Sequence, residues 1–291
     1  MKLMQEDATP GALRLVRILV FATWFIRVAF KPLYKVSYIP DSLYDPVGLL
    51  ALVPHALQPL LRNAAFLHGL KAAALLSFVL VIAGLWLRWS MLAACILMTL
   101  FASIWRGFAG HIDHESILIL FAGYLLTLFE FADRRAEARG EHVAPGGPTR
   151  AGIPLTTILA VLLWVYMTVA VFRLVHGAPG VFTTNSLTFW ALRNAYETAQ
   201  PVIGMGKLVV QYPILGRMLD AGFPVITLIE LTSLLALVSK EYRWIFLAVM
   251  VPFHILSLFV LDVFFWENMV LYVLFFPLAR RALAEPRPAT A

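Results

Sequence analysis

Charged residues are scarce in this sequence, and their scarcity indicates the class of protein. Of 291 residues, 14% are charged and 61% are hydrophobic, and the mean hydropathy is +0.82. A soluble domain carries roughly 25% charged residues. No stretch is both polar enough and long enough to fold as a separate soluble domain. We therefore expect residues 1–291 to form a single membrane domain.

Cysteine is almost absent, and several catalytic motifs are missing. Cys95 is the one cysteine, so no intramolecular disulfide can form and dithiol redox chemistry is excluded. No phosphate-binding loop, nucleophile elbow or dinucleotide fingerprint occurs, so nucleotide hydrolysis and serine hydrolase chemistry have no support. The net charge of +6 does not indicate nucleic-acid binding, because the basic residues lie between apolar segments, where membrane topology accounts for them.

Apolar runs of nearly membrane-spanning length recur along the chain. They cover approximately residues 14–30, 69–87, 90–105, 116–132, 154–175, 222–239, 244–262 and 266–279. The first run continues without a small-residue cleavage site, so it is expected to be a retained helix and not a signal peptide. A span takes about 20 apolar residues, so the pattern predicts an all-α polytopic membrane helix bundle of about eight transmembrane helices.

Basic residues indicate how the bundle is oriented. The short loop 133–150 carries Arg134, Arg135, Arg139 and Arg150, which is the clearest cytoplasmic signature in the chain. Both termini are then expected in the cytoplasm, and the protein in the cell (inner) membrane as a multi-pass protein. This topology places most histidines and several carboxylates on the outer side: His55, His68, His111, His114, His176, His254, Asp113, Glu115, Asp262 and Glu267.

The stretch Gly110–Glu115 holds the densest group of ionisable residues. If a helix begins here, His111 lies one turn from both His114 and Glu115, so the three side chains share a face. Such a group can handle protons or bind a divalent metal, or it can be a helix entrance that meets water at the headgroups. The ligand set is less complete than zinc sites usually show, so no metal is assigned.

Other candidates lie in or beside the later spans. His254 is predicted at membrane depth, where an ionisable residue is costly and therefore suggests function, although a neutral imidazole bonded to a carbonyl is the alternative. Trp266 and Glu267 stand at the next helix entrance. Glu230 lies deep in a span, as a proton relay or as a hydrogen-bonding group between helices.

Two basic pairs stand at outer helix ends. Arg173 shares a face with His176, and Lys31 follows one turn after Arg27. Each pair could attract an anionic headgroup or substrate. The alternative is that the long side chains reach the interface while their stems stay in the apolar region.

The order of these motifs resembles the HTTM (horizontally transferred transmembrane) family, which includes the membrane part of vitamin K-dependent gamma-glutamyl carboxylase. The segments that carry the resemblance are Gly110–Leu118, Val169–Leu174 with Phe189–Leu192, and Phe253–Pro277. In that carboxylase a membrane-embedded lysine deprotonates vitamin K hydroquinone. The nearest position here is Arg173, and arginine stays protonated, so strict gamma-carboxylase (lyase) activity is not expected.

The resemblance implies a carboxylase-like or quinone-linked membrane enzyme with an outward-facing cavity. Its substrate would be a quinone-like lipid or a peptide, changed by proton abstraction or oxidation, with a quinone or hydroquinone as cofactor and membrane lipid as partner. The expected catalytic residues are His114, His254, Glu115 and Glu267, and the expected substrate-binding residues are Arg173, His176, Lys31, His111 and Trp266. The competing hypothesis is a non-catalytic lipid- or partner-binding scaffold or a small transporter.

Overall fold

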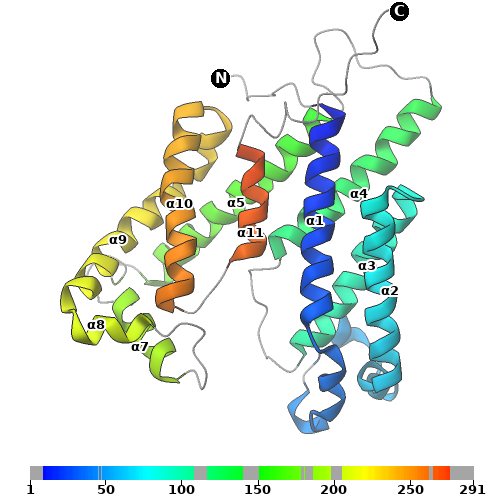
Figure 1. Ribbon diagram of the computed structural model, residues 1–291, viewed down its shortest axis with the longest axis horizontal. Coiled ribbons are helices and arrows are strands. Elements are labelled where there is room, and N and C mark those ends of the chain that lie inside the picture. The colour runs from blue at the N-terminus through cyan, green and yellow to red at the C-terminus, as the bar shows by residue number, and fades with distance from the viewer. Residues whose placement is uncertain are drawn as a thin grey trace, which may run out of the picture. The chain divides into compact units, whose positions relative to one another are not determined.

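The computed structural model describes residues 9–44, 46, 48–107, 117–139, 151–177, 180, 186–197, 205–261 and 265–275. Over these residues the chain is helical and contains no strand, which confirms the all-α prediction (Figure 1). The chain divides into two compact units, which we call the N-terminal unit (within Asp7–Leu155) and the C-terminal unit (within Thr156–Pro277). The single membrane domain over 1–291 stays a prediction.

Four long helices form the N-terminal unit: α1 (Pro10–Phe30), α2 (Ala64–Ala83), α3 (Leu87–Arg106) and α4 (Ile117–Ala138). Figure 1 shows α1 beside α2, and α2 beside α3. Between α1 and α2 the chain forms short 3-10 helices, Leu33–Tyr38, Asp41–Leu43, Gly48–Leu52 and His55–Arg62. Phe21, Trp24 and Phe78 are fully buried, and the Trp24 ring lies edge-on to the other two at 4.9 and 5.8 Å. These rings form the centre of the unit's core.

The two ends of α1 are each closed by a side chain. Thr9 precedes the helix, and its hydroxyl accepts a hydrogen bond of 3.1 Å from the backbone N–H of Ala12. At the other end Lys71 of α2 donates to the carbonyl oxygens of Ala29 (2.8 Å) and Lys31 (3.0 Å). A cation here satisfies carbonyls that the helix itself leaves without partners. It also ties α1 to α2.

The C-terminal unit begins inside a helix shared with the preceding segment, α5 (Gly152–Gly177). It continues with α7 (Ser186–Glu197), α8 (Leu208–Gln211), α9 (Pro213–Leu231), α10 (Lys240–Leu261) and α11 (Trp266–Val270), and with the 3-10 helices Met205–Lys207, Ser233–Leu237 and Leu271–Phe275. Helices α7 and α8 pack against α9, which lies beside α10 (Figure 1). Phe246 of α10 is fully buried and stacks on Phe275 at 5.4 Å.

Among the described residues, four helices are long and apolar enough to cross a membrane. They are α2, α3, α5 and the segment Lys240–Val260 of α10. Helices α1, α4 and α9 have similar lengths but carry charged residues such as Arg17, Glu130 and Glu230 along them. The predicted final span, 266–279, consists over its described part of the short α11 followed by a 3-10 helix. The apolar helices agree with a membrane protein.

Tyr44, between α1 and α2, is a buried phenol outside the predicted spans. Its ring lies against Gly107, where a Cβ atom would come within 2.7 Å of a ring carbon. The guanidinium of Arg62 lies 5.4 Å from the ring centroid. The hydroxyl is buried and has no hydrogen-bond partner among the described residues. Burial raises the pKa of Tyr44 to about 12, because it disfavours the charged phenolate.

The first prediction concerns the contact between α1 and α4. Gly123 of α4 faces the Trp24 ring so closely that an added Cβ would overlap it. We expect Gly123→Ala to lower the free energy of unfolding by about 1–3 kcal/mol, because the surrounding core must shift. Thermal unfolding in detergent measures the effect. Gly69→Ala on α2 is the control, since nothing lies within 4 Å of its added Cβ. Equal behaviour of the two variants would contradict the packing described for Trp24.

The second prediction concerns pH. Unfolded Tyr44 loses its proton near its ordinary pKa of about 10, whereas the folded protein holds the proton to a pH of about 12. The folded state therefore binds more protons in this window, and stability falls as the pH rises through it. Tyr44→Phe should weaken that fall and cost little at neutral pH, since no hydrogen bond is lost. Thermal unfolding as a function of pH measures this, with exposed Tyr38→Phe as the control.

Candidate functional site

Three buried side chains with hydroxyl or imidazole groups are hydrogen-bonded to one another inside the C-terminal unit. His254 lies in α10 with 3% of its surface exposed. Its Nε2 atom is 2.8 Å from the hydroxyl oxygen of Tyr166 on α5, which is 2.6 Å from the hydroxyl oxygen of Tyr272. Three side chains from three elements therefore form one continuous hydrogen-bonded path. Hydroxyl groups both donate and accept, so a proton can move along this path in either direction.

Aromatic rings enclose this path. Phe246 meets Tyr166 edge-on with ring centroids 5.5 Å apart, and Phe265 lies 4.9 Å from His254. Rings of this kind exclude water and lower the local dielectric constant, which strengthens the hydrogen bonds between the enclosed groups. The same environment makes any unpaired charge costly. The enclosure therefore favours neutral side chains in the resting site.

An ion pair lies beside the tyrosines. Arg173 of α5 donates from Nη1 to Glu230 Oε2 at 2.5 Å and to Thr227 Oγ1 at 3.0 Å, both on α9. The Glu230 side chain is 3% exposed and that of Arg173 21%. Glu230 also interacts electrostatically with Tyr166 and Tyr272. The ion pair therefore lies within electrostatic reach of the proton path. We call Tyr166, Arg173, Glu230, His254 and Tyr272 the His254 cluster.

The short helix α11 adds two more buried polar residues to the unit. Glu267 and Asn268 are 4% and 3% exposed. The Oδ1 atom of Asn268 is buried and has no hydrogen-bond partner among the described residues. Buried acceptors are nearly always bonded, so such an atom suggests a water molecule or ligand that completes it. Asn268 is therefore an acceptor that a bound hydroxyl group could use.

An apolar recess lies on the same unit, between α7, α9 and α10. Its volume is about 370 Å³, and its lining includes Met218, Ile226, Pro252, Phe253 and Leu256. Phe253 precedes His254 in α10, so the recess and the His254 cluster share that helix. A recess with so few polar groups suits hydrocarbon and not a charged ligand.

The structure sorts the residues that the sequence suggested. It brings His254 and Arg173 into one cluster and buries Glu267, and it leaves Trp266 half-buried beside it in α11. His176 is exposed and stacks on Phe172 at 4.0 Å. Lys31 belongs to the N-terminal unit, where its Nζ atom lies 4.7 Å from the Trp105 ring centroid. His111, His114 and Glu115 lie outside the described residues, and all the assigned roles stay predictions.

Tyr166 and Tyr272 were missed by the sequence reasoning. Both lie in apolar runs, where a tyrosine is usually interpreted as a residue that only packs in the core. One signal was present, because a buried tyrosine hydroxyl usually needs a partner. Tyr166 also lies about two helical turns before Arg173, on the same side of α5. Glu230 was recognised as unusual, and its bond to Arg173 fits the interpretation as a link between helices.

Neither a search for metal-binding groups nor a comparison with known proteins identifies a function for this site. No group of three or more His, Cys, Asp or Glu side chains in the described part of the chain could hold a metal ion. The sequence matches no family model, no curated protein and no solved structure. The resemblance to the HTTM family therefore stays a prediction.

The third prediction tests the ion pair of the His254 cluster. Glu230→Gln leaves the Arg173 charge largely buried without its carboxylate, so we expect a loss of roughly 3 kcal/mol in the free energy of unfolding. Replacing both residues by methionine should cost much less, because no unpaired charge remains. Thermal unfolding in detergent compares the variants. Glu241→Gln is the control: it weakens an exposed hydrogen bond from Ser239 but leaves no buried charge unpaired, so it should cost much less than Glu230→Gln. A double variant as unstable as the single one would argue against a paired charge.

Proposed function

We propose that this protein is a multi-pass membrane enzyme of the HTTM type that removes protons from a quinone-like lipid, or from a lipid-exposed peptide, at an outward-facing cavity. The single observation that carries the proposal is the buried hydrogen bond between His254 and Tyr166, which joins two helices long and apolar enough to cross a membrane. An ionisable side chain there is costly and is usually retained for function. The proposal includes about eight spans, cytoplasmic termini and the cell (inner) membrane as its location.

The proton path suggests how the reaction begins. A hydroquinone hydroxyl group would give its proton to the Tyr272 oxygen while the Tyr272 proton passes to Tyr166. The Tyr166 proton would then pass to Nε2 of His254, so one O–H bond of the substrate is broken and one N–H bond forms. General base catalysis of this kind needs a group within hydrogen-bond reach of the proton it takes. Arg173 cannot be the base, because it stays protonated and is paired with Glu230.

The remaining candidates take supporting roles in this proposal. Glu267 and the Asn268 acceptor would orient the substrate hydroxyl groups. His114 with Glu115 remains a second candidate base. His111, His176, Lys31 and Trp266 remain candidates for substrate binding. A hydroquinone could donate a hydrogen bond to the Asn268 acceptor, and a bound quinone or hydroquinone would supply the redox chemistry.

The apolar recess favours a second candidate function. A protein that only binds lipid, as a scaffold or a small transporter, needs an apolar surface recess and no proton path. The recess between α9 and α10 has that character. Under this alternative, substitutions at His254 and Tyr166 would change stability alone. Substitutions such as Ile226→Trp in the recess would then abolish lipid binding.

The fourth prediction tests the enzyme proposal. The protein in lipid nanodiscs is supplied with a short-chain naphthohydroquinone in air, and quinone formation is followed by ultraviolet absorbance. Each turnover converts one hydroquinone and one O₂ to one quinone and one H₂O₂. We expect His254→Gln and Tyr166→Phe each to lower kcat about 10²-fold or more, because each interrupts the proton path. KM should change little, since both groups act on the proton transfer.

The control for this experiment is His68→Gln. His68 is exposed on α2 in the N-terminal unit and stacks on Tyr34 at 5.4 Å, so its loss should leave turnover unchanged. Thermal unfolding is measured in parallel, so that a loss of folding is not read as a loss of catalysis. Full turnover in folded His254→Gln and Tyr166→Phe protein would refute the proton path.

A further inference from the structure

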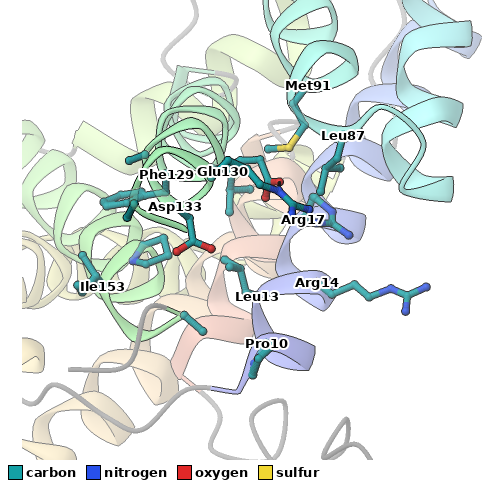
Figure 2. Close-up of a pocket in the computed structure, with 16 residues that line it drawn as sticks. Pro10, Leu13, Arg14, Arg17, Leu87, Met91, Phe129, Glu130, Asp133 and Ile153 are labelled. Carbon is teal, nitrogen blue, oxygen red and sulfur yellow. Dashed lines mark hydrogen bonds and ion pairs between the residues drawn. The ribbon is translucent and has the colours of Figure 1, made fainter. Parts of the chain in front are cut away.

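A cavity in the N-terminal unit shares no residue with the His254 cluster. Its volume is about 670 Å³, and it is bounded by the beginnings of α1, α3 and α5 and by the later part of α4. The basic loop that follows α4 predicts that this end of the unit faces the cytoplasm. Figure 2 shows charged and apolar side chains around one cavity. An amphipathic lining suggests an amphipathic ligand.

One side of this cavity is electropositive. Arg14 and Arg17 of α1 line it, and the buried Nε atom of Arg17 has no hydrogen-bond partner among the described residues. Pro10 and Leu87, the first residues of α1 and α3, also line the cavity, as does Ile153 in the first turn of α5. The positive ends of three helix dipoles therefore lie around it. Guanidinium groups beside helix starts favour a phosphate.

The other side is electronegative. Glu130 and Asp133 of α4 line the cavity, and Figure 2 shows both carboxylates on the same helix, Glu130 toward Arg17 and Asp133 nearer Ile153. Glu130 interacts electrostatically with Arg17 and forms a 3.4 Å ion pair with Arg134. The two carboxylates lie about one turn apart on α4, so their negative charges add on this side of the cavity. An ammonium group is the ligand that suits this side.

Apolar side chains complete the lining. Leu13, Met91, Leu126 and Phe129 line the same cavity as the charged groups. They provide an apolar surface for a hydrocarbon chain. The charged groups could bind a headgroup that carries both a negative and a positive charge. A ligand with only a negative charge would be repelled by the two carboxylates. A ligand with only a positive charge would be repelled by the two arginines.

We propose that this cavity binds a phospholipid of the predicted cytoplasmic leaflet through a headgroup that carries a phosphate and a primary amine. Arg17, with Arg14, binds the phosphate. Glu130 and Asp133 accept hydrogen bonds from the ammonium group, and the upper acyl chain lies against Met91 and Phe129. This binding is independent of the chemistry at His254.

The fifth prediction tests this assignment with delipidated protein in detergent. Phosphatidylethanolamine, phosphatidylglycerol and phosphatidylcholine with identical chains are titrated, and native mass spectrometry and the shift in Tm report binding. We expect phosphatidylethanolamine to bind most tightly, because only its headgroup has both a phosphate and a hydrogen-bond-donating ammonium group. Arg17→Gln should weaken it about tenfold or more. Asp133→Asn should remove the preference for phosphatidylethanolamine over phosphatidylglycerol.

Arg88→Gln is the matched control. Arg88 follows Leu87 in α3 but points over the Trp89 ring, 5.5 Å from its centroid, and does not line the cavity. Equal binding of the three lipids by the wild type, or an equal loss in Arg88→Gln and Arg17→Gln, would overturn the proposal. If Arg17→Gln does not fold, Ala136→Trp fills the cavity and keeps every charge. Undiminished phosphatidylethanolamine binding by Ala136→Trp would also overturn it.

Discussion

The ion pair between Arg173 and Glu230 is the interaction on which the C-terminal unit depends. A charge withdrawn from water must be paired within the protein, or it costs several kcal/mol by a rough estimate. Arg173 and Glu230 are 57 positions apart, so their contact fixes α5 against α9. It also sets the rotation of α5, because Tyr166 lies about two turns earlier on the same side of the helix. That rotation carries the Tyr166 hydroxyl to His254 and Tyr272.

The N-terminal unit is held together differently, by rings and helix ends. Trp24 occupies the space left by Gly123, and Lys71 closes the end of α1. Neither contact requires a buried ion pair. Charged side chains such as Arg17, Glu130 and Asp133 instead line a cavity bounded by the beginnings of three helices and by α4.

Much of the apolar surface in both units remains exposed. In the apolar windows of α2, α5 and α10 only 33% of the residues are buried. Phe172 and Trp164 on α5 are 63% and 58% exposed. In water such surface would drive association, but lipid tails solvate it as well as a protein core does. The packing of these helices therefore rests on specific contacts, such as the Ser233 hydroxyl that donates to the Leu163 carbonyl at 2.6 Å.

The sequence by itself indicated a helical membrane protein, because the number of apolar residues in a run decides whether that segment is more stable in lipid than in water. It therefore predicted the helices of the all-α fold, and it marked His254 and Glu230 as unusual residues within spans and Arg173 as a basic residue at the end of one. Only the tertiary structure decided which of them meet. Helices such as α5 are apolar on nearly every side, so the pattern does not reveal which face turns inward. Tyr166 and Tyr272, 106 positions apart, become partners only when three elements pack around them.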